Sequence, residues 1–445
     1  MIDSRLNQVM SQLREGIRIP VIVELGTAPT PAALQELRGA GLSVTTTSQI
    51  SPLVYGTATS NIIGTIAANP IVVKVFYDEP LYPALALPFG LEVERQEVVP
   101  LGESVAATGA PALWEQGITG KGVKIGVVDT GVSQSHEMIR PGLKGTFSAV
   151  PGESVEDENH HGSWCCSAAA GRPVATEQGE LVGAAPEADL YALKALSDKG
   201  TGQMSWVMQC IEKAAVDFKC DVISMSLGSL FDNGGLDPVS KLVNDVVQKY
   251  NVLCAVAAGN SFIPLSIGSP GGAISAVTVG SYALRLPLAG TPSSFESKGP
   301  TTSLVIKPDT SAPGGNIMAP GIAEMILAAG AHGSYQSMAG TSMATPQAAG
   351  ALALLRQAKP DLSRIEVEQL LAVSSFPAPK DTLRGYGPIR ADTMYGNMGR
   401  ALPPITQFQA PLNALQSMFY APLTLIPRPE NERLRVVRLP AIMGG

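Results

Sequence analysis

From residue 110 onward, continuous apolar runs alternate with segments that have helical periodicity. The apolar runs are "VKIGVVDTG", "LYALKAL", "CDVISMSLG", "NVLCAVAAGN" and "AISAVTVGS", and several of them end close to a glycine. The segments "SWVMQCIEKAAVDF" and "DPVSKLVNDVVQKY" have the spacing of amphipathic helices. Strands that lack polar alternation and are separated by helices indicate a parallel sheet covered on both faces. We therefore predict an α/β domain over residues 110–400, with its chemistry at the carboxyl ends of the strands.

A different pattern precedes this domain. "IPVIVEL" is a strand pattern, and "TPAALQELRGAG" is helical, with Thr30 as N-cap, Pro31 at the first helical position and Gly41 beyond the end. The β-rich runs "LSVTTTSQI" and "PLVYGTA" follow, then a short helix, "TSNIIGTIAAN", and a last strand, "IVVKVFYD". This β-α-β-β-α-β order predicts a small α+β domain of ferredoxin-like type over residues 19–78.

Changes in composition set the remaining boundaries. Residues 79–105 are rich in proline and acidic residues, and "DEPLYPALALPFG" is typical of an extended connection. We therefore expect an N-terminal helix and small domain over residues 1–85 and a linker over 86–109. Residues 401–445 are proline-rich with weak periodicity, which predicts an irregular tail.

Composition and charge exclude several classes of protein. Of the 445 residues, 45% are hydrophobic and 16% are charged, which suits a large buried core. The net charge of −7 disfavours nucleic acid as a partner, and no apolar run has the length of a membrane helix. Five cysteines make a disulfide framework improbable, and the N-terminal twenty residues lack the apolar core of a secretory signal. We expect a cytoplasmic protein; secretion stays open if a signal was removed.

Three turn motifs each place one reactive side chain at the end of an apolar element. "VVDTG" places Asp129 after a strand, "HHGSWCCSAAAG" places His161 before a helix, and "GTSMATP" places Ser342 before the apolar run "QAAGALALL". Singly, each residue could be a cap or a structural side chain. Together, an acid, an imidazole and a hydroxyl are what nucleophilic acyl transfer requires, because a base must take the hydroxyl proton and a third group must orient that base.

These motifs, and their order along the chain, resemble those of the subtilisin-like serine proteases (subtilases) over about residues 110–395. "GTSMATPQAAG" is the most diagnostic match, and "AAPEADLYALK", "SLGS" and "AVAAGN" also match family patterns. The resemblance implies a catalytic triad of Asp129, His161 and Ser342. It also implies that the N-terminal domain is an inhibitory propeptide that assists folding and caps the site until it is cut off.

The histidine motif needs a histidine followed by glycine, which selects His161 and leaves His160 as an exposed loop residue. In the family pattern a second histidine follows three positions later, where this chain has Trp164. Cys165 and Cys166 are expected to pack as small buried hydrophobic residues, with a thiol role near the site as a less favoured alternative.

The resemblance also implies the residues that bind substrate. Asn260 would supply a side-chain amide to the oxyanion, and the backbone N–H of Ser342 would supply the second donor. An extended peptide would add as a strand between two edges, and the pocket for the residue before the cut would be roomy and suit large apolar side chains. The residues expected along the edges and in this pocket are Gly200, Thr201, Gly202, Ser226, Leu227, Gly228, Ala257 and Gly259.

No cofactor is expected. Many subtilases hold calcium in a loop within the histidine helix, helped by an acid whose place here falls on Met138. The loop reads "GRPVATEQGELVG", so calcium stays possible without a convincing set of ligands.

We therefore expect a serine endopeptidase, made as a zymogen that processes itself near Ala84 or Leu85, with Leu85 preferred as the residue before the cut. Its partners would be polypeptide substrates and its own propeptide. A catalytically silent pseudoprotease is the alternative, with the N-terminal domain as a permanent lid. A lipase or esterase is disfavoured because Ala344 stands where Gly-x-Ser-x-Gly needs its second glycine.

Overall fold

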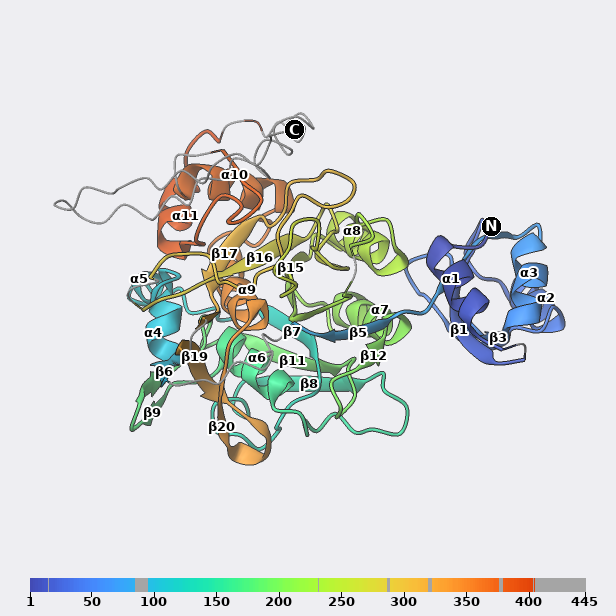
Figure 1. The fold of residues 1–445 in the computed structure, drawn as a ribbon. Helices are drawn as coiled ribbons and strands as arrows, with labels where there is room; N and C mark the ends of the chain where they lie inside the picture. The colour runs from blue at the N-terminus through green and yellow to red at the C-terminus, as the bar shows by residue number, and fades with distance from the viewer. Residues whose placement is uncertain are drawn as a thin grey trace, which may run out of the picture.

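The structure is a computed structural model that describes residues 1–14, 16–84, 95–230, 232–285, 289–318, 322–375, 379–402 and 404. Figure 1 shows a large body with a small N-terminal domain at its side, joined by a strand that runs into the body. Within these residues, none of the helices is long and apolar enough to span a membrane.

A seven-stranded parallel sheet forms the centre of the body, in the order β17-β16-β15-β13-β7-β11-β8. The predicted parallel sheet is therefore confirmed. From β7, the later strands β13, β15, β16 and β17 extend the sheet in one direction, and β11 and β8 extend it in the other. In sheets of this kind, ligands bind at such a switch point, beyond the carboxyl ends of the strands. The strands are β7 (Lys124–Asp129), β8 (Leu143–Ser148), β11 (Asp189–Lys194), β13 (Val222–Met225), β15 (Leu253–Ala257), β16 (Val277–Tyr282) and β17 (Thr310–Pro313).

Helices cover both faces of this sheet and form two apolar clusters with it. One cluster includes α4 (Leu101–Ala106), α5 (Ala110–Trp114), α6 (His161–Ala170), α9 (Thr341–Ala358), α10 (Arg364–Ser374) and α11 (Ala391–Asn397). The other includes α7 (Met204–Glu212), which continues into a π turn (Lys213–Asp217), and α8 (Pro238–Tyr250). Both α6 and α9 consist mainly of small residues, and α9 packs closely beneath β13, β15 and β16.

A second, smaller sheet consists of β18 (Asn316–Met318), β19 (Ile322–Ala329), β20 (Tyr335–Met338) and β6 (Arg95–Pro100), which pairs in parallel with β19. A short hairpin is formed by β9 (Val174–Thr176) and β10 (Gly179–Leu181). The predicted linker over residues 86–109 is wrong for its second half, because β6 and α4 pack on the body. Apolar contacts of Val99, Leu101 and Val105 with the core outweigh the acidic, proline-rich composition. The expected tail lies outside the described residues, except for 401, 402 and 404.

The N-terminal domain has the predicted order of elements. It contains α1 (Ser4–Gln12), β1 (Arg18–Leu25), α2 (Pro31–Gly39), β2 (Ser43–Thr47), β3 (Leu53–Thr59), α3 (Ser60–Ala68) and β4 (Val72–Tyr77). The sheet order is β2-β3-β1-β4 with antiparallel pairing throughout. Thr30 caps α2 as expected, since its Oγ1 accepts the N–H of Ala33. This domain has a hydrophobic core of its own, which includes Leu6 and Leu37.

The outer face of this small sheet packs on α7 and α8. Ile22, Leu53, Tyr55 and Phe76 belong to the same apolar cluster as the two helices. Buried carboxylates fix both ends of α7: Asp78 accepts the N–H of Ser205 at 2.8 Å, and the carboxylate of Glu212 accepts hydrogen bonds from the Ser48 hydroxyl and the Gln49 N–H. The N-terminal domain is therefore held by apolar area and by polar contacts at each end of one helix.

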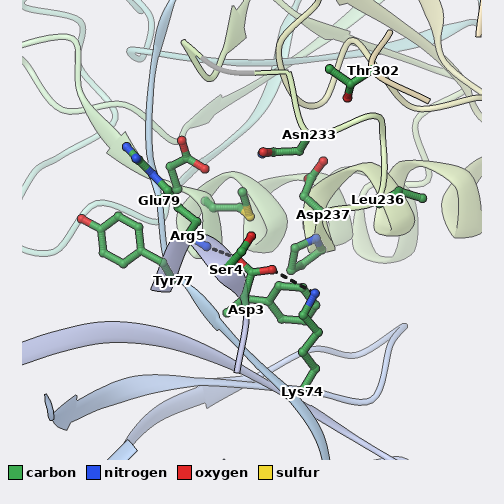
Figure 2. A pocket seen from close by; sticks show the side chains of 13 residues that line it. Asp3, Ser4, Arg5, Lys74, Tyr77, Glu79, Asn233, Leu236, Asp237 and Thr302 are labelled. Atoms are coloured by element: carbon green, nitrogen blue, oxygen red, sulfur yellow. Dashed lines mark hydrogen bonds and ion pairs between the residues drawn. The ribbon is translucent and has the colours of Figure 1, made fainter. Parts of the chain in front are cut away.

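A cavity of about 300 Å³ lies beside α1, between the N-terminal domain and α8 (Figure 2). Its lining mixes charged, polar and apolar side chains, and Asp3 and Lys74 form an ion pair there at 2.9 Å. None of the described predicted site residues lines it, so this cavity belongs to the domain interface and not to the predicted chemistry.

Candidate active site

Asp129 and His161 meet at the carboxyl end of β7. Asp129 is the last residue of that strand and His161 the first of α6, and both side chains are buried. His161 Nδ1 lies 2.6 Å from Asp129 Oδ1, which also accepts the N–H of Thr130 at 2.7 Å. This contact fixes the imidazole with Nε2 turned away from the acid. Nε2 has no hydrogen-bond partner among the described residues, which leaves it available to take a proton.

The hydroxyl of Ser342 points to a different acceptor. Ser342 is the second residue of α9, and its Oγ donates to the carbonyl oxygen of Ser226 at 2.9 Å. In return, the Ser226 hydroxyl donates to the Ser342 carbonyl, also at 2.9 Å. The hydroxyl-to-imidazole link of the predicted triad is thus not made in this structure. His161 and Ser342 nevertheless lie close to each other, because Cys165 Sγ is 3.9 Å from His161 Nδ1 and 3.7 Å from the Ser342 carbonyl oxygen.

Asn260 follows β15 and faces the start of α9. Its Oδ1 accepts two hydrogen bonds from Thr341, from the N–H at 3.1 Å and from the hydroxyl at 3.0 Å. These bonds orient the amide so that Nδ2 donates to the carbonyl oxygen of Ala84. The N–H of Ser342 donates to the same oxygen at 3.2 Å. Two donors, one of them at a helix N-terminus, therefore converge on one carbonyl oxygen.

The segment that brings Ala84 there is a strand, β5 (Pro80–Pro83), which leaves the N-terminal domain and enters the body. It lies between two strand edges of the body, β12 (Gly202–Gln203) and β14 (Leu227–Gly228), and pairs antiparallel with both. Beyond β5, the N–H of Ala84 donates to the Ser226 carbonyl at 3.0 Å. The chain that leaves the N-terminal domain thus occupies the predicted peptide groove as far as Ala84, which contacts Ser342.

The predicted groove residues divide into two groups. Gly202, Leu227 and Gly228 pair with β5, and Ser226 bonds to Ala84. Gly200 lies next to the ring of Pro83, and its φ of +75° is a backbone conformation that favours glycine. The other three do not pair with β5: Thr201 lies between Gly200 and Gly202, Ala257 is the last residue of β15, and Gly259 precedes Asn260.

Sequence reasoning missed Gln203, which pairs with Pro80, and Thr341, which orients the Asn260 amide. The glutamine carries no chemical signal, since its backbone makes the contact. The threonine lies inside the serine motif, where its hydroxyl could have suggested a partner.

The expectation that His160 is an exposed loop residue is wrong. His160 is half-buried, and its Nδ1 accepts the N–H of Ala331 at 3.0 Å. Cys165 and Cys166 are buried as expected, and desolvation raises the pKa of both thiols well above the usual value. Both therefore stay protonated near neutral pH.

One group of potential metal ligands occurs in the described residues, and it belongs to this site. Donor atoms of Asp129, His161 and Cys165 all lie within 4.8 Å of one another. This set is not suited to calcium, which prefers several oxygen ligands. At the loop considered for calcium, the guanidinium of Arg172 donates to the carbonyl oxygens of Ala170, Pro186 and Ala188.

Comparison with known proteins agrees with this geometry. The sequence model of the Subtilase family matches residues 120–397, more than half of the chain. The chain belongs to the subtilase family. Among its relatives, serine protease AprX of Bacillus subtilis strain 168 is 36% identical over 279 residues, which are 58% of this chain and 62% of AprX. Subtilisin NAT of Bacillus subtilis subsp. natto is 34% identical over 283 residues, 62% of this chain and 66% of its own length.

The alkaline protease of Shouchella clausii is 32% identical over 306 residues, 67% of this chain and 72% of that protein. The chain spans less than two thirds of AprX and of subtilisin NAT. The matched family region begins after α5, so the family assignment concerns the body and leaves the N-terminal domain to be judged by its contacts.

Proposed function

We propose that this subtilase is a serine endopeptidase that forms an acyl-enzyme on Ser342. The observation that carries the proposal is the carbonyl of Ala84, which receives hydrogen bonds from Ser342 N–H and Asn260 Nδ2 beside the buried Asp129–His161 pair. A peptide carbonyl held by two donors next to a serine hydroxyl is the arrangement needed before attack.

In the proposed reaction, Ser342 Oγ turns from the Ser226 carbonyl toward the imidazole and attacks the peptide carbon. His161 Nε2 takes the hydroxyl proton, and Asp129 stabilises the imidazolium through the 2.6 Å contact. The oxyanion is held by Asn260 and by the N–H of Ser342. Nε2 then gives its proton to the leaving amine as the C–N bond breaks, which leaves the acyl group on Ser342 Oγ. In the second half of the reaction, His161 Nε2 takes a proton from a water molecule that attacks the acyl carbon. The C–O bond to Ser342 breaks, the hydroxyl regains its proton from Nε2, and the acid is released.

The N-terminal domain is proposed to be both the first substrate and the first inhibitor. The Ala84 carbonyl oxygen accepts both hydrogen bonds, so we propose that the bond between Ala84 and Leu85 is cut. This arrangement favours Ala84, and not Leu85, as the residue before the cut. Leu85 itself lies outside the described residues. After cleavage, β5 would keep its pairing with both groove edges and hold the fragment in place as a product.

The groove also suggests a selectivity. Leu81, three residues before Ala84, is fully buried in the apolar cluster that includes Met204, Val207 and Leu227. We propose a preference for an apolar residue at that place, together with large apolar residues directly before the cut, where Ala257 and Gly259 leave room. The preference for a large residue directly before the cut rests on these pocket residues, since Ala84 itself has a small side chain.

A compartment can be proposed from the cysteines. All five cysteines are unpaired and buried. Free thiols are typical of proteins in a reducing compartment, so we propose the cytoplasm.

The first experiment is hydrolysis of casein by purified protein, with Ser342→Ala as the matched control. We expect hydrolysis by the wild type and none by the variant. Hydrolysis that persists undiminished in Ser342→Ala would refute the assignment of the nucleophile.

A pseudoprotease is the second candidate, because Ser342 Oγ donates to Ser226 and not to His161 in this structure. A fluorophosphonate probe separates the two candidates, since it reacts only with an activated serine. Labelling of the wild type, but not of Ser342→Ala, favours the protease. A wild-type protein that stays unlabelled after removal of its N-terminal fragment favours the pseudoprotease.

A further inference from the structure

The proposed base sits at the first position of α6, so its placement depends on the residue before it. That residue, His160, is the N-cap of the helix and has φ +75° and ψ −26°. A left-handed backbone is unfavourable for a side chain other than glycine, asparagine or aspartate, and such residues persist where their surroundings hold them. The His160 side chain does not cap α6 itself.

The side chain of His160 is held by the turn between β19 and β20, residues 330–334. Its Nδ1 accepts the N–H of Ala331 at 3.0 Å, which requires a neutral imidazole with its hydrogen on Nε2. Gly330 permits this approach, because a Cβ at that position would lie 3.1 Å from the same nitrogen. The carbonyl of His160 meanwhile accepts the N–H of Trp164 and begins the helical hydrogen bonds.

The same side of α6 makes further bonds to this hairpin. Residues 160, 164 and 167 fall on one face of a helix. Trp164 Nε1 donates to the carbonyls of Ile326 in β19 and Gln336 in β20, each at 3.1 Å. Ser167 Oγ accepts the N–H of Ala329 at 3.2 Å. Three side chains spaced along α6 therefore bind the backbone of both hairpin strands and their turn.

His161 and Cys165, the next residues around α6, face the candidate active site. His161 contacts Asp129, and Cys165 lies between His161 and the Ser342 carbonyl. Since both sets of residues belong to one helix, a rotation of α6 that broke the hairpin contacts would also move His161 Nε2 relative to Ser342. The first turn of α6 is the part most exposed to such a change, because its N-cap is strained.

We propose that His160 is a positioning residue for the reaction. By accepting the Ala331 N–H, it holds the left-handed N-cap of α6 and so fixes His161 Nε2 where it can take the Ser342 proton. Trp164, which stands where the family pattern has a histidine, fixes the same face of the helix one turn later. This inference rests on the proposed function, because it concerns the efficiency of the same proton transfer.

Two substitutions of His160 separate backbone strain from the acceptor. His160→Gly relieves the strain at φ +75° but removes the acceptor, whereas His160→Asn tolerates the left-handed backbone and offers an amide oxygen near the place of Nδ1. In protein that has processed itself and has been freed of the N-terminal fragment, we expect kcat for a peptide substrate to fall at least about tenfold in His160→Gly, with KM within about twofold. We expect His160→Asn to stay within about threefold of the wild type.

The rate of fluorophosphonate labelling gives a second readout that does not depend on the peptide groove. It should fall in His160→Gly, recover in His160→Asn and fall less in Trp164→Phe, which loses one donor on the same face. The matched control is His332→Asn, an exposed residue of the same turn whose imidazole contacts Glu158; its labelling rate should equal that of the wild type. Thermal unfolding of each variant checks that it is folded.

Equal labelling rates for His160→Gly and the wild type would overturn the inference, as would equal losses in His160→Gly and His160→Asn. If wild-type protein freed of its N-terminal fragment is not labelled at all, the proposed function fails instead.

Discussion

Leu81→Ala is predicted to loosen the hold of the cleaved N-terminal domain on the groove. Leu81 is fully buried, and it belongs to the apolar cluster formed by α7, α8 and the outer face of the small sheet, not to the core of the small domain. The substitution should therefore weaken binding without unfolding the domain that carries it. Tyr82 is the matched control, because adjacent residues in a strand face opposite ways and Tyr82 is only half-buried.

The magnitude follows from the size of the buried group. Removing the buried leucine side chain beyond Cβ typically costs about 2–5 kcal/mol where the surroundings cannot close the space. Taking about 3 kcal/mol, with about 1.4 kcal/mol for each tenfold change, the fragment should bind roughly 100-fold more weakly. The backbone pairing of β5 with Gly202 and Gly228 remains in both variants, so we expect Tyr82→Ala to change binding much less.

The assay dilutes autoprocessed protein into a peptide substrate and follows the appearance of activity as the fragment dissociates. Most of the change should lie in the dissociation rate, so activity should appear on the order of 100-fold sooner in Leu81→Ala. After complete removal of the fragment, the rates of all variants should be equal, since Leu81 and Tyr82 are not in the body. Release from Leu81→Ala at the wild-type rate would refute the reasoning, as would release from Tyr82→Ala at the same increased rate.

Four further predictions test other contacts. Asn260→Ala should lower kcat by about 10²–10³-fold in the freed enzyme, a magnitude taken from the same loss in subtilisin, and unchanged kcat would argue against the oxyanion assignment. Burial raises the pKa of Asp78 from 3.8 to about 6, so the bound state takes up a proton that the free state lacks. Through Asp78 alone, fragment affinity should therefore rise about tenfold between pH 7 and 5. Asp78→Asn should weaken this dependence of the inhibition constant, while Glu79 and Glu212, whose pKa burial also raises, keep part of it. Met343 is buried beside Ser342, so conversion to the sulfoxide should impair turnover; full activity in a sample with oxidation verified by mass spectrometry would contradict this. Asp309 accepts hydrogen bonds from Lys307, Arg364 and Lys380 in the core, so Asp309→Asn should cost about 3–5 kcal/mol in urea unfolding of the freed body, and a loss below 1 kcal/mol would contradict it.

Local chemistry allowed most of the fold to be predicted. The apolar run before Asp129 is a buried strand, and the small residues after Ser342 form a helix that packs closely beneath the sheet. By contrast, β6 has the sequence "RQEVVP", and its pairing with β19 depends on partners more than 220 residues away. A strand defined by its partner leaves little periodicity of its own.

The elements of the site could be predicted, but their final placement could not. The motifs select Asp129, His161, Ser342 and Asn260, because each lies at the end of an apolar element. The position of Ala84 depends on the register of β5 against Gly202 and Gly228, which composition does not specify. The direction of the Ser342 hydroxyl depends on a side-chain rotation, and the partner of His160 lies in the turn between β19 and β20.

The most direct test of the account is the intact mass of the purified chain, compared with that of Ser342→Ala. If Ser342 attacks the carbonyl held by Asn260, the wild type should yield two fragments, residues 1–84 and 85–445, while Ser342→Ala stays whole. A wild-type chain that stays whole, or one cut between the same two residues when Ser342 is replaced, would contradict the central claim.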